Sequence, residues 1–380
     1  MLGQAWEVQS VALLMALCIG SSAWAQERVE AEQKEEEGLS WVGFPTFKFN
    51  DDSGFVYGAQ ASLIDVQEGL EPFVWELRAR AEHSTRNRHD HALVWDAPHG
   101  IPLGRLSVRA EVLHVDDANY FGVGNGTVRP SSESQTRMRL TQPRSQINLR
   151  RDFDQGLFVS GGVEASWVRI RAREDSLLEQ QRPLGWDGSH ALVLRGGVGY
   201  DTRDDEIIPR SGVLTELYLK GASDALGSSS TFGGVGATQQ VYLAPFSWMV
   251  LAGRLMVDAQ MGDVPLAELY RMGGERSFRG LGGVFSQRGY SEGRFIGRTK
   301  ALGNGELRLL APLVWGGLQL GGGPFVDASR VVDGGPIWED VHVSGGGELV
   351  IGWKNLLVFR MDYAVSDEEG LFYIEGRYLF

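Results

Sequence analysis

Apolar and polar side chains alternate with a period of two through residues 40–380, and turn-forming residues interrupt the pattern about every 10 to 30 residues. The C-terminal segment is the clearest example, since Phe372, Ile374 and Tyr378 would share one face of a strand and Glu375 would lie on the other. The longest fully apolar run, residues 11–19, is less than half of the ~20 residues that a membrane-spanning helix needs. The pattern therefore predicts an all-β fold.

The number of strand-like segments and the lengths of their connections distinguish two β architectures. A soluble sandwich also alternates, with its polar face in water. About sixteen segments are too many for one small sandwich, but they suit a large closed barrel in which short turns and long loops alternate. The short turns are centred on residues 67–69, 154–156, 244–246 and 353–355, and the long loops cover residues 116–144, 172–188, 262–302 and 328–341. We therefore expect a transmembrane antiparallel β-barrel of about 16 strands.

Charge and cysteine content exclude several classes of protein. The formal net charge of −13 argues against a nucleic-acid partner, because phosphate binding depends on clustered Lys and Arg. The single cysteine, Cys18, excludes a disulfide framework and a cysteine-based zinc site. The modest mean hydropathy of −0.17 agrees with a barrel, since only half of each strand would face lipid.

The N-terminal residues predict a targeting segment. Ala23-Trp24-Ala25 follows the apolar run as a small-x-small cleavage site, so residues 1–25 are interpreted as a signal peptide. No Lys or Arg precedes the run, and a buried apolar helix is the alternative. Residues 26–39 are acidic and predict a solvated periplasmic tail, with the barrel domain at residues 40–380. The tail is too short for a further folded domain.

Five short motifs occur in order along the expected barrel. They are Tyr120-Phe121-Gly122-Val123-Gly124-Asn125, then Asp201-Thr202-Arg203-Asp204 with Pro209 and Gly212, then Gly273-Gly274 followed by Arg279-Gly280-Leu281, then Gly303-Asn304-Gly305-Glu306-Leu307-Arg308, and finally Phe325-Val326-Asp327-Ala328-Ser329. With the terminal Phe380, this series resembles the bacterial surface antigen superfamily of outer-membrane barrels, which includes BamA, TamA and the two-partner secretion translocators. The resemblance departs at Leu281, where an aromatic residue is usual, and at Ser329, where glycine is usual.

The resemblance implies a long loop that folds into the lumen and is fixed there by charge. In this interpretation Arg279 meets Glu306 and Asp327, and Gly280 permits close backbone approach. Strand alternation independently predicts that both carboxylates face the lumen. Such a loop would serve as a seal that stiffens the barrel or as a gate, since either would use the same residues. The resemblance also implies that Tyr378 and Phe380 form a C-terminal signal for the barrel assembly machinery.

Two other clusters have a chemical and a structural interpretation. Asp201, Arg203 and Asp204 could bind a metal or phosphate, but a hydrogen-bonded turn at the periplasmic rim is the favoured interpretation. His89-Asp90-His91, with His83 nearby, could bind a metal or act in a surface hydrolase. Basic neighbours on an expected loop favour a solvated polar tip instead. No serine lies in a nucleophile motif, so we expect no catalytic residue, no metal and no cofactor.

The expected protein is an integral barrel of the outer membrane of a Gram-negative bacterium, in contact with outer-membrane lipid. The resemblance implies membrane-protein or lipid handling, or a gated pore, with an unfolded outer-membrane protein or a lipid as client. It does not imply an enzyme. The alternatives are a barrel enzyme with an extracellular rim site and a structural or adhesive surface protein. The periplasmic repeat domains that assembly and secretion members use to receive clients have no counterpart in the expected short tail.

Overall fold

The computed structural model describes residues 38–130, 132–206, 208–274, 277–311, 318–353, 356–375 and 380. The expected signal peptide and nearly all of the acidic tail lie outside these residues. The first strand begins at Gly38, close to the predicted start of the barrel at residue 40.

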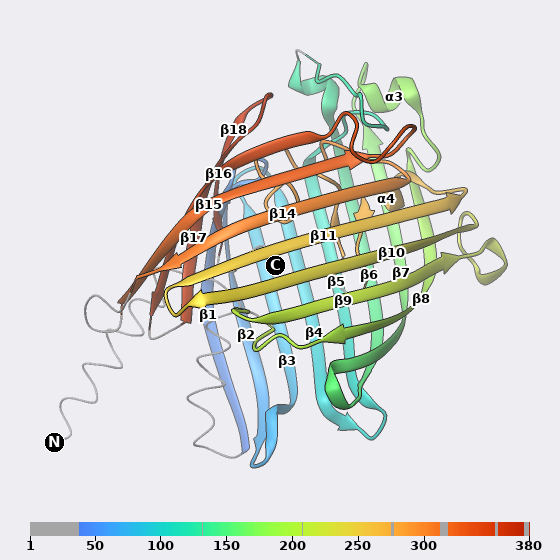
Figure 1. Ribbon diagram of the computed structural model, residues 1–380. Coiled ribbons are helices and arrows are strands. Elements are labelled where there is room, and N and C mark those ends of the chain that lie inside the picture. The colour runs from blue at the N-terminus through green and yellow to red at the C-terminus, as the bar shows by residue number, and fades with distance from the viewer. Residues whose placement is uncertain are drawn as a thin grey trace.

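In the described part of the chain, sixteen strands close into one antiparallel barrel (Figure 1). The order around the barrel is β1 to β11 and then β14 to β18, with β18 returning to β1. The first eight are β1 (Gly38–Asn50), β2 (Gly54–Gln67), β3 (Leu70–Ser84), β4 (Arg88–Ile101), β5 (Gly104–Asn119), β6 (Arg137–Asp152), β7 (Leu157–Ala172) and β8 (Gly188–Asp201). The others are β9 (Gly212–Ala222), β10 (Phe232–Phe246), β11 (Met249–Gly262), β14 (Thr299–Leu310), β15 (Leu318–Val331), β16 (His342–Trp353), β17 (Leu356–Val365) and β18 (Gly370–Glu375). The predicted fold class and strand number are confirmed.

The remaining elements are short and lie in the connections. They are the helices α3 (Leu177–Gln181) and α4 (Leu266–Leu269), the 3-10 turns Glu133–Thr136, Asp154–Gly156 and Asp224–Leu226, and the two-stranded sheet of β12 (Arg271–Met272) and β13 (Phe278–Arg279). Among the described residues, no helix has the length and apolar character needed to cross a membrane.

The period of two sorts the side chains between the two faces of the barrel wall. Apolar side chains such as Leu217, Leu219 and Leu255 point outward and are more than half exposed. Their neighbours along the same strands, such as Tyr218 and Arg254, are buried on the lumen side. Closing the sheet gives the strands hydrogen-bond partners around the ring, which hydrocarbon surroundings require.

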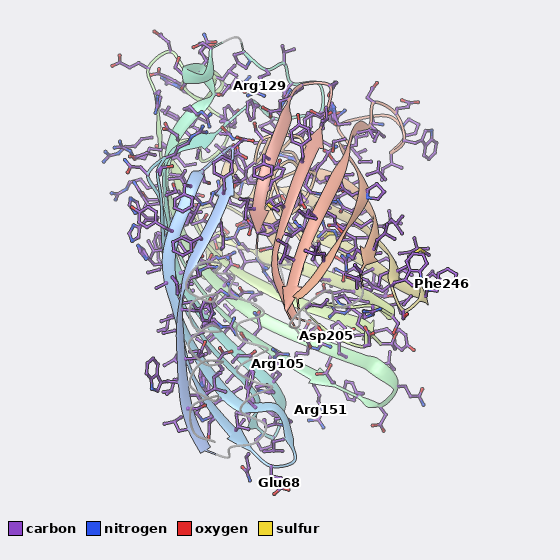
Figure 2. All side chains as sticks on the ribbon, turned by 90° about the vertical axis from the view of Figure 1, so that its left-hand side faces the viewer. Glu68, Arg105, Arg129, Arg151, Asp205 and Phe246 are labelled. Carbon is purple, nitrogen blue, oxygen red and sulfur yellow. The ribbon has the colours of Figure 1, made fainter. Side chains whose placement is uncertain are left out.

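The two ends of the barrel differ in the length of their connections (Figure 2). Long connections leave β5, β7 and β11, and we call this the long-loop end; Arg129, in the loop after β5, marks it. Glu68 and Arg151 lie at the opposite end, where the short turns are, and we call this the short-turn end. The arrangement matches that of membrane barrels, whose long loops are extracellular.

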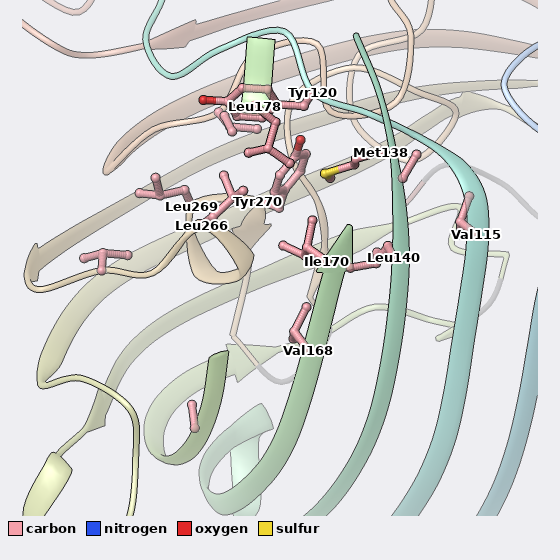
Figure 3. Packing of buried hydrophobic residues seen from close by; sticks show 14 of the residues in the cluster. Val115, Tyr120, Met138, Leu140, Val168, Ile170, Leu178, Leu266, Leu269 and Tyr270 are labelled. Atoms are coloured by element: carbon pink, nitrogen blue, oxygen red, sulfur yellow. The ribbon is translucent and has the colours of Figure 1, made fainter. Parts of the chain in front are cut away.

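A hydrophobic core lies inside the long-loop end (Figure 3). Its strand residues are Val115, Met138, Leu140, Val168 and Ile170, which point inward from β5, β6 and β7. Leu178 of α3 and Leu266, Leu269 and Tyr270, in and just after α4, pack against them. The loop between β11 and β14 is therefore fixed to the inner wall by burial as well as by charge.

The first and last strands meet at a seam that closes the barrel. β1 pairs with β2 along its whole length, from Gly38 opposite Val66 to Asn50 opposite Gly54. On its other side, Phe49 lies opposite Ile374 of β18 and Asn50 lies opposite Tyr373. Residues 376–379, which follow β18, lie outside the described residues.

We expect charge to be tolerated on the lumen face and not on the outer face. Leu217→Arg places a charge in the apolar outer band of β9 and should cost about 2–4 kcal/mol of folding free energy if it lies near the bilayer midplane. Ser160→Arg places the same charge on the lumen side, in a polar hollow lined by Glu216, Arg195 and Lys220, and should cost much less. Urea titration in lipid vesicles measures both. Equal losses would show that the two faces are misassigned.

Candidate functional site

The loop between β11 and β14, residues 263–298, enters the barrel and contacts its inner wall at several points. We call it the lumen loop. Among its buried side chains are Arg271, Arg288, Tyr290 and Arg294, which are nearly inaccessible to solvent. Arginines this deeply buried need carboxylate partners, because an unpaired charge in such a place is costly. Strands of the wall supply the partners of Arg271 and Arg288, and Glu368 in the turn between β17 and β18 supplies the partner of Arg294.

Arg288 is the centre of a buried ion-pair cluster, which we call the charge lock. Its guanidinium donates from Nε and Nη2 to both oxygens of Asp327 at 2.8 and 3.0 Å, and its backbone N–H donates to Oδ2 at 3.0 Å. Nη1 lies 2.9 Å from Oε1 of Glu306 and 3.7 Å from Oδ2 of Asp362. Burial lowers the pKa of Arg288, but Asp327 and Glu306 outweigh burial and hold that pKa above its ordinary value.

Adjacent strands bring the partners of Arg288 together. Asn304 lies opposite Asp327 in the β14–β15 pairing, and its amide donates to Asp327 Oδ1 at 2.8 Å and to the carbonyl of Ser286 at 2.7 Å. The guanidinium carbon of Arg288 lies 3.5 Å from the centre of the Phe325 ring, a close cation–π contact. Two of the sequence motifs, one on β14 and one on β15, thus meet at Arg288.

The glycine after Arg288 is required by the backbone. Gly289 has a φ of +88°, which L side chains rarely adopt. A Cβ there would also lie 3.0 Å from the Cβ of Ser344 on β16. Tyr290 follows, and its hydroxyl donates to Asp367 in the turn between β17 and β18. The turn therefore holds Arg288 close to the wall.

Arg279 is a correction to the sequence interpretation. It lies in β13, where it pairs with Arg271 of β12, and its Nε is 3.5 Å from Oε1 of Glu292. Its guanidinium also lies 5.6 Å from the Tyr270 ring. The two predicted carboxylates do face the lumen, but the cation between them is Arg288. The next residue, Gly280, has a φ of +62° and approaches Gly293 closely, so close backbone approach occurs there as expected.

A signal in the sequence distinguishes the two Arg-Gly pairs. Arg279-Gly280 is followed by Leu281, whereas Arg288-Gly289 is followed by Tyr290, the aromatic residue that the motif usually has. The departure at Leu281 was therefore evidence that the motif lies nine residues further along the chain.

A second anchor holds the beginning of the lumen loop, and the sequence interpretation missed it. Arg271 donates to Oε1 of Glu164, a fully buried residue of β7. Glu164 also accepts from Arg195 at 3.0 Å and lies 3.7 Å from Arg144. Three guanidinium groups thus surround one carboxylate. Pairing of charges from distant segments leaves no local pattern in the sequence.

A third contact links the lumen loop to the first turn of the barrel. Asp52, between β1 and β2, accepts from the backbone N–H of Glu292 and from the amide of Asn119, both at 2.8 Å. The Glu292 side chain lies 2.9 Å from Arg88 of β4. Burial and then the nearby Glu292 raise the pKa of Asp52 from 3.8 to about 6. Asp52 thus differs from Glu292, whose pKa is raised by burial but lowered more strongly by Arg88 and Arg279.

The raised pKa predicts that this contact depends on pH. Because the folded loop binds the Asp52 proton more tightly than an open loop does, the stabilisation is complete below about pH 3.8 and is lost as the pH rises through about 6. Hydrogen exchange should therefore show greater protection around Glu292 at pH 5 than at pH 7.5. Asp52→Asn should remove that difference, because the amide does not titrate in this range. An unchanged pH dependence in Asp52→Asn would contradict the prediction.

The turn between β8 and β9 contains the other predicted cluster, at the short-turn end. Arg203 donates from Nε and Nη2 to both oxygens of Asp201 at 2.9 Å. Asp204 accepts from the backbone N–H groups of Arg210 and Ser211. The carboxylates of Asp201 and Asp204 and the guanidinium of Arg203 thus have hydrogen-bond partners within the turn.

Only one of the two residues of the expected C-terminal signal is among the described residues. Tyr378 lies outside the described residues. The ring of Phe380 lies 4.8 Å from the guanidinium of Arg254, and its backbone oxygen accepts from Arg308 at 3.0 Å. Both arginines belong to the inner face of the wall, so the terminal ring lies on the lumen side.

Several solved structures of other proteins resemble this barrel in fold. BamA from Haemophilus ducreyi lacking POTRA domains 1–3 matches with a TM-score of 0.59 and 16% identity, over 89% of this chain and 70% of that one. CdiB from Escherichia coli matches with a TM-score of 0.58 and 9% identity, over 88% of this chain and 62% of that one. CdiB from Acinetobacter baumannii reaches 0.49 and 12%, over 88% and 59%. At these identities the likeness concerns the fold.

The chain forms a closed barrel of sixteen strands, and buried ion pairs hold a long loop inside its lumen. These two features are typical of barrels of the membrane-spanning class. The family model of the Omp85 superfamily domain matches residues 105–366, and the chain belongs to that superfamily. The predicted family resemblance is confirmed. None of the curated proteins compared matches the chain.

Proposed function

We propose that this protein is a gated barrel of the Gram-negative outer membrane that handles membrane clients and is not an enzyme. The observation that carries the proposal is the attachment of the lumen loop by ion pairs at Arg271 and Arg288. Ion pairs hold the loop in one defined position. Unlike covalent bonds, they can break together and release the loop. A loop that closes the lumen in this way fits a gate.

The seam between β1 and β18 is the lateral route in this proposal. The two strands pair at Phe49 and Asn50, and parting them there would free an edge of β1 in the barrel wall. An unpaired strand edge is a template for an incoming strand, whose backbone hydrogen bonds would extend the sheet. This geometry favours an outer-membrane protein segment over a lipid as client.

The likeness to BamA and CdiB adds support at the level of the fold. Partners in the proposal are outer-membrane lipid, the barrel assembly machinery during insertion of this chain, and the client. A structural or adhesive role would not require a lumen loop held by breakable contacts.

Photo-crosslinking in cells tests the proposal. A photoreactive residue at Trp41, on the outer face of β1 beside the seam, should form adducts with newly made outer-membrane proteins. The same residue at Leu255, on the outer face of β11, is the matched control and should contact lipid only. A disulfide between Phe49→Cys and Ile374→Cys, which are Cα partners across the seam, should abolish the Trp41 adducts. The cysteine at position 18 is replaced by serine in every variant.

The outcomes are distinct. Protein adducts at position 41 that disappear with the seam disulfide support lateral handling of protein clients. Lipid adducts alone at position 41 would contradict the protein client, and identical adducts at positions 41 and 255 would contradict the lateral route.

A further inference from the structure

Four of the seven histidines of the chain gather on one part of the outer face. His83 lies on β3, His89 and His91 on β4, and His114 on β5, so the four come from three neighbouring strands. In the pairing of these strands, His83 lies opposite His89, and His89 lies opposite His114. The cluster is near the long-loop end, and its members are half-buried. These histidines are therefore part of the barrel wall, which corrects the expectation of a solvated loop tip.

Three of these side chains converge. One ring nitrogen from each of His83, His89 and His91 lies within 4.8 Å of the others. The Nδ1 atoms of His83 and His89 are 2.6 Å apart. Three nitrogens bound to one Zn²⁺ at about 2.0–2.1 Å in tetrahedral geometry stand about 3.3 Å apart, so small ring rotations would bring these atoms to ligand positions.

Neighbouring rings restrict the rotations of the three imidazoles. The ring of Tyr57 stacks beside His83, with centroids 6.2 Å apart, and the ring of His114 stacks beside His89 at 5.8 Å. His114 is itself held by Thr141 at 2.8 Å and by Asp116 at 3.2 Å. His114 thus supports the cluster from the side, as outer-shell groups do in metal sites.

The residue between the two β4 histidines does not belong to the cluster. Asp90 points to the other face of the sheet, where it accepts from Arg80 at 3.0 Å. The converging donors are therefore three imidazoles without a carboxylate. Such a set suits Zn²⁺, Cu²⁺ and Ni²⁺ and does not suit Ca²⁺ or Mg²⁺, which prefer oxygen ligands.

We propose that His83, His89 and His91 form a binding site for a transition-metal cation of the Zn²⁺ or Cu²⁺ type on the outer surface of the barrel. The three imidazoles supply three ligands, and the position that points away from the wall is open to water or to another ligand. The site is separate from the lumen loop, so it does not depend on the proposed gate.

Titration of the full chain with ZnCl₂ tests the site, using detergent-solubilised barrel without a polyhistidine tag. The wild type should bind one Zn²⁺ per barrel, and binding should weaken at pH 5, where free imidazole is protonated. His83→Gln and His89→Gln should each weaken binding by about 100-fold or more, since loss of outer-shell partners alone costs 10–100-fold. The control is His190→Gln, because His190 also lies beside an aromatic ring, that of Trp167, but is exposed and outside the cluster.

Electron paramagnetic resonance of the Cu²⁺-loaded barrel provides the second measurement. Hyperfine structure from three nitrogens in the wild type, reduced in His91→Gln and unchanged in His190→Gln, supports the site. Equal Zn²⁺ binding by the wild type and by His83→Gln, or no stoichiometric binding by a correctly folded wild type, would overturn the proposal. Heat-modifiable gel mobility shows whether each variant is folded.

Discussion

Replacing Arg288 by alanine is expected to release the tip of the lumen loop at a cost of about 3–5 kcal/mol, the usual penalty for removing one partner of a buried ion pair. Asp327 would then keep its charge in a buried place without its cation, while Glu306 and Asp362 would retain Arg308 and Arg360 as partners. The barrel itself should stay closed, because its strand ladders do not pass through Arg288. Limited proteolysis should show new cleavage in residues 280–296, and urea titration should give the loss of stability.

Two further variants give the controls for this prediction. Arg279→Ala removes an arginine of the same loop that is partly exposed and lies 3.5 Å from one carboxylate, so it should cost about 1 kcal/mol or less. Arg288→Lys should rescue poorly, since lysine cannot make the two parallel contacts with Asp327. Equal protection of the loop in Arg288→Ala and Arg279→Ala would contradict the assignment of Arg288 as the locking cation.

The partners of Arg288 allow a test of coupling. The double change Glu306→Gln and Asp327→Asn removes the carboxylates instead of the cation. If the three residues act as one cluster, adding Arg288→Ala to this pair should cost much less than Arg288→Ala alone. Simple additivity would show that Arg288 is held by something else.

Neutralising Glu164 is the second change with a large expected effect. Glu164→Gln would leave Arg271, Arg195 and Arg144 close together around an uncharged amide in a fully buried position. Both lost attraction and new repulsion then act, and we expect a loss of about 3–5 kcal/mol, with the start of the lumen loop released. Hydrogen exchange of residues 266–274 measures the release. Glu174→Gln, an exposed position in the loop after β7, is the matched control and should have no measurable effect.

The two anchors should act independently of each other. Glu164 and Arg288 share no partner in the described structure, so the losses from Glu164→Gln and Arg288→Ala should add within about 0.5 kcal/mol. A double variant much less damaging than the sum would show that one anchor holds only when the other is closed.

Strand alternation made most of the fold predictable from the sequence. A period of two needs no long-range information, so the faces of Glu306 and Asp327 and the number of strands were predictable from local patterns. The alternation of short turns and long loops likewise follows from Gly, Pro and Asp in the turns. The barrel fold was therefore predictable, although the placement of the loop inside it depended on the family resemblance.

The site was only partly predictable, for two physical reasons. Two Arg-Gly pairs lie in one loop, and which of them reaches the wall depends on the path of the loop, which local sequence does not specify. The aromatic residue after Gly289 was the available signal. The Glu164 anchor and the histidine cluster depend on which strands are neighbours and on their register. His83 and His114 are 31 positions apart in the sequence, yet both lie beside His89 in the sheet.

Single-channel recording in planar bilayers tests the central claim, that Arg288 holds the lumen loop in a closed position. The wild-type barrel is expected to show small or rare openings, and Arg279→Ala should behave in the same way. Arg288→Ala should show large, frequent openings, and Arg288→Ala combined with Glu164→Gln should be open for most of the recording. Wild-type conductance in both Arg288 variants, with the lumen loop cleavable by protease, would contradict the claim, because a released loop would then not be what closes the lumen.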